Sequence, residues 1–290
     1  MKLIERKFCP LCFSKTKLKT LYCRSYNSQN LSNFIKQYYT NSFLSKIVKK
    51  NNYEIIECLT CNFIYQKNIP SSKLSNFLYD KLIPVDESFK KKISMTSINF
   101  KVFLRDALLI EKMIKKDNYR TEILEFGSGW GIWARFMKTL NFKVTTLEIS
   151  KKRVAHIKKN NLQNYNNIKK IKKKFDIIFS DQVIEHINNP YYDMLLLIKL
   201  LKKNGYMIHK FPSSFLFKNK IAKNYEVKKD CAHPLEHINI FTKKSMLILS
   251  KKLKLKIINP IYIKNIPLIT KIVLIKNYFL FNTVILTKKN

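Results

Sequence analysis

Three closely spaced glycines mark the part of this 290-residue chain that is best suited to bind a ligand. Gly127, Gly129 and Gly131 alternate within five residues, although the whole chain contains only four glycines. Glycine adopts backbone conformations that other residues avoid, and it lets a ligand approach the main chain closely. The cluster therefore predicts a turn whose backbone lies against a bound ligand.

Two carboxylates accompany this turn. Glu125 comes two residues before the first glycine, and Glu148 ends the next expected strand. A dinucleotide-binding turn has its third glycine one position later, where this chain has Ile132, and its pyrophosphate disfavours a nearby negative charge. A ligand with a cationic end tolerates Glu125, and Glu148 can accept hydrogen bonds from both hydroxyls of a ribose. The pattern favours a cationic nucleoside over a dinucleotide.

The segment ILEFGSGWGIWARFM, residues 123–137, resembles the E/D-x-G-x-G-x-G motif of class I S-adenosylmethionine-dependent methyltransferases. FDIIFSDQVIEHINNP (175–190) and LLKKNGYMIHKFP (200–212) resemble the fourth strand and the fifth-strand turn of that family. The resemblance covers residues 95–290 and implies S-adenosylmethionine as the cofactor. An acid that often follows the third strand is replaced by lysine-rich sequence, so the adenine is expected to meet backbone instead. The implied cofactor contacts are Glu125, Gly127, Ser128, Gly129, Gly131, Glu148, Asp181 and Gln182.

Two C-x-x-C pairs lie in the first quarter of the chain, Cys9 with Cys12 and Cys58 with Cys61. Each pair can present two thiolates to one tetrahedral Zn²⁺, and four protein ligands would make that zinc structural. The spacer, residues 13–57, is longer than the usual interval of about 15–20 residues and is expected to contain an inserted helix near residues 34–50. The alternative is a set of redox-active or buried cysteines.

This cysteine pattern resembles methyltransferases with an N-terminal zinc-binding segment, among them sugar methyltransferases of polysaccharide and antibiotic-sugar pathways. The resemblance implies a small polar acceptor, a sugar or nucleotide sugar. Those enzymes carry a Y-H-E-H element with a basic histidine, whose last two residues match Glu236 and His237. His237 is therefore a candidate general base, with a structural histidine as the alternative.

A second histidine, His186, follows Glu185 just after the expected fourth strand. Some RNA and quinone O-methyltransferases hold Mg²⁺ with an E-x-x-E-H motif, but here Gln182 replaces the first acid, which removes a charged ligand. Glu185 and His186 are therefore expected to position the loop, with metal binding as the alternative. The candidate catalytic residues are His237, Glu236 and His186.

Strand-like and helix-like segments alternate from residue 122 onward, which predicts an α/β fold with a doubly wound Rossmann-like sheet. We expect residues 1–70 to form a small zinc-binding domain, 71–94 a linker with a short helix at 71–79, and 95–290 the methyltransferase domain. The expected strands are 122–126, 143–149, 175–180 and 206–211, with an extended segment at 255–263 and an edge strand at 283–287. The expected helices are 96–116, 132–140, 151–160, 191–203 and 242–253.

The net charge of +37 does not by itself indicate a nucleic-acid partner. Only six of the 56 basic residues are arginine, the residue that nucleic-acid readers favour, and lysine is spread along the whole chain. An RNA methyltransferase and a zinc protein that binds the cofactor without turnover stay open as alternatives. No run of about 18 apolar residues and no signal-peptide pattern occurs, so we expect a cytoplasmic protein without a membrane span.

Overall fold

The computed structural model describes residues 1–83, 89–90, 94, 97–114, 117–221, 225–280 and 282–288. The chain divides into two compact units. Unit 1 comprises Met1–Val85, Ile184–Tyr191 and Pro212–Leu249, and unit 2 comprises Asp86–Val183, Tyr192–Phe211 and Ser250–Asn290. This division is not the linear one expected from the sequence, because two later segments group with the cysteine-bearing N-terminal part.

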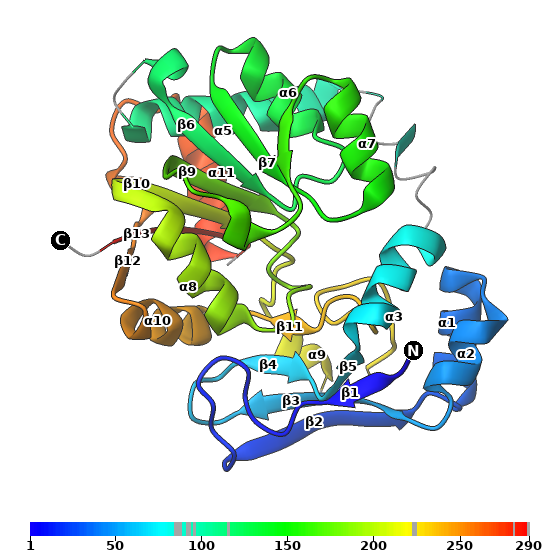
Figure 1. Ribbon diagram of the computed structural model, residues 1–290. Coiled ribbons are helices and arrows are strands. Elements are labelled where there is room, and N and C mark those ends of the chain that lie inside the picture. The colour runs from blue at the N-terminus through cyan, green and yellow to red at the C-terminus, as the bar shows by residue number, and fades with distance from the viewer. Residues whose placement is uncertain are drawn as a thin grey trace. The chain divides into compact units, whose positions relative to one another are not determined.

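Unit 2 is built on a seven-stranded sheet in the order β12-β13-β10-β9-β6-β7-β8 (Figure 1). The strands are β6 Glu122–Phe126, β7 Lys143–Leu147, β8 Gln163–Tyr165, β9 Phe175–Asp181, β10 Leu201–Lys210, β12 Leu255–Ile257 and β13 Thr283–Lys288. The five strands from β10 to β8 are parallel, whereas β13 is antiparallel to both β10 and β12. The strand order reverses between β6 and β9, and ligands of doubly wound sheets bind at such a reversal.

Helices cover both faces of this sheet. α6 (Ile132–Thr139) and α7 (Lys151–Lys159) connect β6, β7 and β8, and α8 (Pro190–Leu200) connects β9 to β10 in the opposite direction. Because such crossovers are right-handed, the helices of the two directions lie on opposite faces. The predicted doubly wound α/β fold is confirmed.

One large apolar core fills unit 2. Ile123, Ile177 and Ile208 of the strands pack with side chains from three helices, α5 (Ser97–Ile114), α6 and α11 (Leu268–Phe279). Within this core the rings of Trp133 and Phe179 stack in parallel at a centroid distance of 4.0 Å. This packing fixes the ends of β6 and β9, from which the candidate ligand-binding residues extend.

Several expected elements differ in the structure. The helix expected over residues 191–203 ends at Leu200, and β10 begins at the next residue, with an irregular register before Tyr206. The segment expected to be extended over 255–263 contains only the short β12, followed by a 3-10 turn over Pro260–Tyr262 (η4). The closing strand at 283–287 is not an edge strand, because β13 lies between β10 and β12.

Unit 1 contains a four-stranded antiparallel sheet in the order β11-β4-β3-β2 and a β1-β5 pair. Its strands are β1 Leu3–Glu5, β2 Leu18–Ser25, β3 Asn52–Cys58, β4 Ile64–Gln66, β5 Asn68–Pro70 and β11 Asn239–Ile240. The helix expected near residues 34–50 is two helices, α1 Gln29–Tyr39 and α2 Ser42–Val48, and the short helix expected at 71–79 is α3 Ser72–Phe77. The remaining elements are η1 Leu78–Leu82, η2 Asn118–Arg120, η3 Ile168–Lys170, α9 Phe217–Ile221 and α10 Lys243–Lys252.

Candidate cofactor and metal sites

The glycine turn connects β6 to α6 at the reversal of strand order. All three glycines have positive φ, +73° at Gly127, +55° at Gly129 and +69° at Gly131, a region that other residues rarely adopt. A Cβ atom on Gly127 would lie 2.5 Å from Val183 Cγ2, whereas a Cβ on Gly129 would meet nothing within 4 Å. The first glycine is therefore required by packing, and the second leaves open space in which a ligand can approach the backbone.

Glu148 is bound to the glycine turn by its carboxylate. Its Oε2 accepts a hydrogen bond of 2.8 Å from the backbone N–H of Gly129, and its Oε1 accepts two of 2.9 Å from Ile149 and Ser150. These three bonds hold the carboxylate, which is 6% exposed, in one orientation beside the turn. The sequence predicts that this residue binds a ribose. The structure shows in addition that its carboxylate holds the glycine turn.

Buried polar atoms at the turn suit a polar ligand. Ser128 Oγ and Trp130 Nε1 are buried and have no hydrogen-bond partner among the described residues. Such atoms destabilise a fold unless a ligand or water satisfies them. Glu125 is buried beside them at the end of β6. The residues present therefore fit a cofactor with several polar groups, and Trp130 is a candidate contact that the sequence analysis missed.

Asp181 and Gln182 end β9 and border a cavity of about 240 Å³. The Gln182 backbone has φ +55° and donates its N–H to Lys210 O at 2.9 Å. The cavity lies within unit 2, between α5, α11 and the ends of three strands. It is lined by Val102, Arg105, Asp106, Leu109, Asp181, Gln182, Ile208, Lys210, Phe211, Thr270, Val273, Leu274, Asn277, Asn282 and Thr283.

An ion pair lies in the wall of this cavity. Lys210 Nζ is 2.6 and 2.8 Å from the two carboxylate oxygens of Asp106, and Trp133 Nε1 donates to the same carboxylate at 3.1 Å. Burial raises the pKa of Asp106, and the ammonium of Lys210 opposes this effect. Sequence analysis missed this pair because its members are far apart in the chain.

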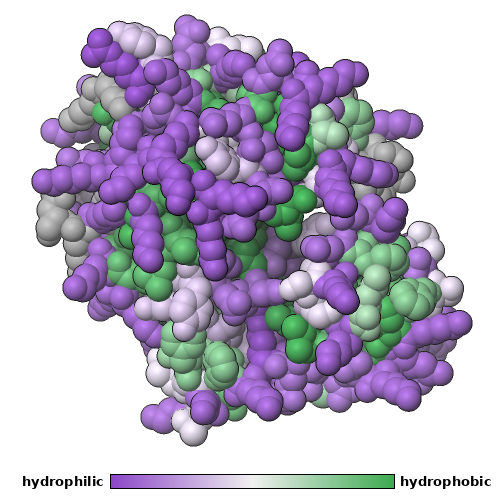
Figure 2. Space-filling model, viewed as in Figure 1, coloured by the Kyte–Doolittle hydropathy of each residue, from purple (hydrophilic) through white to green (hydrophobic). Residues whose placement is uncertain are grey.

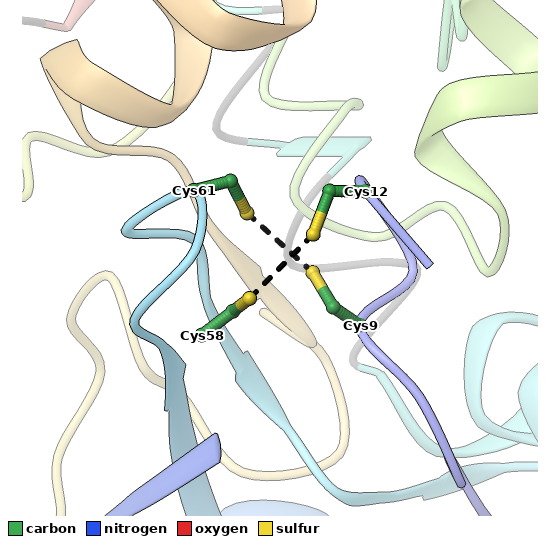
Figure 3. A group of neighbouring side chains, drawn as sticks. All are labelled: Cys9, Cys12, Cys58 and Cys61. Atoms are coloured by element: carbon green, nitrogen blue, oxygen red, sulfur yellow. Dashed lines mark hydrogen bonds between the residues drawn. The ribbon is translucent and has the colours of Figure 1, made fainter. Parts of the chain in front are cut away.

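The four expected zinc ligands lie together in unit 1 and point toward a common centre (Figure 3). Cys9 Sγ is 3.6 Å from Cys61 Sγ, and Cys12 Sγ is 3.5 Å from Cys58 Sγ, too far for disulfides. Tetrahedral sulfurs at a Zn–S distance of about 2.3 Å are separated by about 3.8 Å. The observed spacing fits a tetrahedral metal with only a small expansion.

The two cysteine pairs have the same local geometry. Phe13 and Asn62 follow the second cysteine of each pair with positive φ, and their N–H groups donate to Cys9 O and Cys58 O. Hydrogen bonding with Cys61 lowers the pKa of the Cys9 thiol to about 6, whereas burial raises that of Cys12 to about 11. A thiolate is thus already favoured at one position, and a cation would favour it at all four.

Glu185, His186 and His237 form a second cluster in unit 1, with one ligand atom of each within 4.8 Å of the others. His186 Nδ1 lies 2.8 Å from the backbone oxygen of Glu236 and 2.8 Å from the hydroxyl of Tyr79, and His237 Nδ1 donates to the backbone oxygen of Asp230. The Nε2 of His237 therefore carries a lone pair. Burial lowers the pKa of both rings, to about 3 for His186, so both are neutral at physiological pH.

The carboxylate of Glu236 belongs to a different, internal network. Its Oε1 accepts hydrogen bonds from Tyr39 at 2.9 Å and from His233 Nε2 at 3.1 Å. The ring of Phe34 packs edge-on against His233 at a centroid distance of 5.3 Å. Of the three candidate catalytic residues, Glu236 thus braces α1 against residues 233–237, and the other two present ring nitrogens.

When the strands of unit 2 are numbered 1 to 7 along the chain, their order in the sheet is 3-2-1-4-5-7-6. This order, with the glycine turn at its reversal, defines a class I S-adenosylmethionine-dependent methyltransferase domain. Residues 101–258 match the family described as a methyltransferase domain, and the chain belongs to this family. None of the helices in the described part of the chain is long and apolar enough to span a bilayer.

Three known proteins illustrate the similarity. The ubiquinone biosynthesis O-methyltransferase of Pelagibacter ubique (strain HTCC1062) is 34% identical over 109 residues, which cover 33% of this chain and only 45% of that protein. The plantazolicin methyltransferase BamL, solved in complex with a triazolic desmethylPZN analog and SAH, has a TM-score of 0.53 and 13% identity, covering 74% of this chain and 94% of that one. The magnesium protoporphyrin IX methyltransferase of Synechocystis PCC 6803 has a TM-score of 0.48 and 11% identity, covering 65% and 91%.

Proposed function

We propose that this protein transfers the methyl group of S-adenosylmethionine to an oxygen of a small-molecule acceptor. The observation that carries this proposal is the glycine turn, with open space at Gly129 and two buried polar atoms, of Ser128 and Trp130, that lack protein partners. When bound, the cofactor supplies an electrophilic methyl group, and the protein supplies alignment. The name of the Pelagibacter relative supports oxygen as the accepting atom.

Eight residues are proposed to hold the cofactor. Gly127, Gly129 and Gly131 provide bare backbone, Glu148 accepts from the ribose, and Glu125 offsets the positive charge of the sulfonium. Ser128 bonds a polar group at the turn, and Asp181 and Gln182 face the methionine end from the end of β9.

We propose the cavity bordered by Asp181 as the acceptor site. Arg105 lines it and makes no ion pair or side-chain hydrogen bond with the described residues, although arginine is scarce in this chain. Its planar guanidinium suits a carboxylate or phosphate on the acceptor. The volume of about 240 Å³ matches a single ring with small substituents. A sugar gains no specific support from this cavity or from the comparisons, so the proposed acceptor is a small anionic hydroxyl compound.

The histidine cluster of unit 1 is proposed to supply a general base, the role that the sequence suggests for His237. His237 is the proposed base, because its Nδ1 donates to the backbone oxygen of Asp230 and its Nε2 therefore carries the lone pair that a general base requires. Burial lowers the pKa of His186 to about 3, which makes that ring a weak base. A divalent cation is the second candidate, because Glu185, His186 and His237 offer ligand atoms within 4.8 Å of one another, and His237 Nδ1 donates to a backbone carbonyl, as in metal-binding histidines. The four cysteines are proposed to hold a structural Zn²⁺ that fixes the N-terminal strands.

Calorimetry and turnover together test the proposal. Metal-replete protein is expected to bind S-adenosylmethionine and S-adenosylhomocysteine with micromolar affinity. It is then incubated with hydroxybenzoates, sugar acids, neutral sugars and total RNA, and released S-adenosylhomocysteine is measured. Turnover confined to anionic small molecules supports the proposal, turnover on RNA favours the RNA alternative, and absence of cofactor binding refutes the assignment.

A further inference from the structure

The C-terminal helix α11 presents an unusual apolar face to solvent. Leu268 is 72% exposed, Ile269 75%, Ile272 56% and Phe279 62%. Exposed aliphatic side chains in such numbers on one helix form an apolar patch of the kind that marks an interaction surface. On the face of the molecule shown in Figure 2, by comparison, hydrophilic side chains cover most of the surface. A 12-residue helix with this composition is normally buried.

The opposite side of the same helix is anchored in the core of unit 2. Leu274 belongs to the apolar cluster of the sheet, and Thr270 is 3% exposed. The helix therefore cannot rotate its outer apolar side chains inward without giving up this packing. Tyr262, 78% exposed in the turn η4, extends the apolar surface beyond the helix.

The segment of the chain that contains this face carries charge of one sign. From His237 to the last residue the sequence contains no aspartate or glutamate, whereas it contains eleven lysines. The nineteen acidic residues all precede this segment, so a uniform lysine content does not explain the asymmetry. Lys264 and Lys276 are exposed close in sequence to the apolar residues of α11. A partner is therefore expected to combine negative charge with an apolar interior.

We propose that α11 and η4 form a docking surface for an anionic lipid bilayer. Apolar side chains flanked by lysines are the composition of helices that lie in the plane of the headgroups, where the aliphatic groups enter the acyl region and the ammonium groups meet phosphates. Nucleic acid offers the charge without an apolar phase to receive Leu268, Ile269 and Ile272. The helix is too short to cross the bilayer, which agrees with surface attachment.

Vesicle sedimentation tests this proposal independently of enzymatic activity. The full-length protein is mixed with vesicles of phosphatidylcholine alone or with 30% phosphatidylglycerol, at low and high salt. We expect binding to the anionic vesicles to exceed binding to the neutral ones at least tenfold. Changing Ile269→Ser and Ile272→Ser together is expected to weaken this binding at least fivefold without a change in circular dichroism.

Matched variants separate apolar insertion from charge. Tyr192→Ser removes a side chain on α8 that is 57% exposed, as much as Ile272, and this variant is expected to bind vesicles as the unmodified protein does. Lys264→Gln with Lys276→Gln is expected to weaken binding at low salt. The proposal is overturned if anionic vesicles are not bound, if the double isoleucine variant binds unchanged, or if light scattering shows a dimer that this variant dissociates.

Discussion

The backbone nitrogen of Gly129 lies 2.8 Å from Oε2 of Glu148, so the two main features of the cofactor motif are hydrogen-bonded to each other. The carboxylate that follows β7 holds the turn, and in the function proposed above it also offers its remaining lone pairs to the cofactor. These tasks are coupled, because any change of the carboxylate also alters the position of the glycine backbone.

Replacing Glu148→Gln is expected to weaken S-adenosylmethionine binding at least tenfold. Three backbone N–H groups donate to the Glu148 carboxylate, and the amide nitrogen of a glutamine cannot accept from any of them. At least one of these hydrogen bonds is therefore lost, and a hydrogen bond to a charged group contributes about 1.5–3 kcal/mol. Calorimetry measures the affinity. The control is Glu122→Gln, which changes the first residue of β6 and removes an ion pair with Lys173. This variant should bind S-adenosylmethionine normally.

The glycines of the turn are expected to respond differently to alanine. In Gly127→Ala the new methyl group collides with Val183, which should lower stability by about 1–3 kcal/mol. In Gly129→Ala no protein atom is in the way, so only backbone strain of about 1 kcal/mol remains, while the methyl group occupies ligand space. Thermal unfolding should therefore show a lower melting temperature for Gly127→Ala, and cofactor titration should show weaker binding for Gly129→Ala. Equal melting temperatures with intact binding in both would contradict this account of the turn.

Removal of one cysteine is expected to abolish metal binding in unit 1. Cys58→Ser leaves three thiolates around the centre, and elemental analysis should fall from about one zinc per chain to near zero. Cys23→Ser, an exposed cysteine on β2, should retain the metal. Full zinc content in the Cys58 variant would show that the four sulfurs do not form the site.

The ion pair in the cavity wall is expected to be sensitive to removal of one partner. Asp106→Asn leaves the Lys210 ammonium largely buried without its counterion, which should reduce the free energy of unfolding by about 3–5 kcal/mol. Adding Lys210→Met to this variant should recover most of the lost free energy of unfolding. Asp117→Asn breaks an exposed pair with Arg120 and should change urea unfolding by less than about 1 kcal/mol. An unaltered Asp106 variant would mean that the pair is not buried in solution.

His209 is expected to make stability fall on acidification. Burial lowers its pKa to about 4, whereas a histidine in the unfolded chain titrates near 6.5, so the unfolded state binds more protons between these values. The stabilising contribution of neutral His209 is present above about pH 6.5 and is lost as the pH falls toward 4. His209→Asn, which can keep the 2.7 Å contact with Ser180, should flatten the decline of the urea midpoint over this range. An identical slope in both proteins would refute the assignment.

The sequence could predict those elements that carry a clear hydrophobic pattern or a distinctive glycine spacing. Apolar runs such as residues 175–180 identified the central strands, and the glycine spacing identified the turn. α11 was missed because Ile269 and Ile272 on its outer side are as apolar as the buried Leu274, which removes the helical periodicity. The central position of β13 was also missed, since strand order depends on tertiary pairing.

The candidate sites show the same limit. The four cysteines could be assigned because their short spacings fix each pair locally. Glu185 and His186 were recognised together as neighbours, but their association with His237 requires the fold to join residues about fifty positions apart. Asp106, Lys210 and Arg105 carry no local pattern at all, so only the packing of α5 against the sheet brings them to one cavity.

The position of β13 has a consequence for the biogenesis of the protein. One side of β10 and one side of β12 acquire their hydrogen-bonding neighbour only when residues 283–288 are available. During synthesis on the ribosome, β10 and β12 therefore have unpaired edges until these residues have emerged. Unpaired strand edges can associate with other chains. Messages truncated before codon 283 should consequently yield aggregating products that chaperones and proteases must remove.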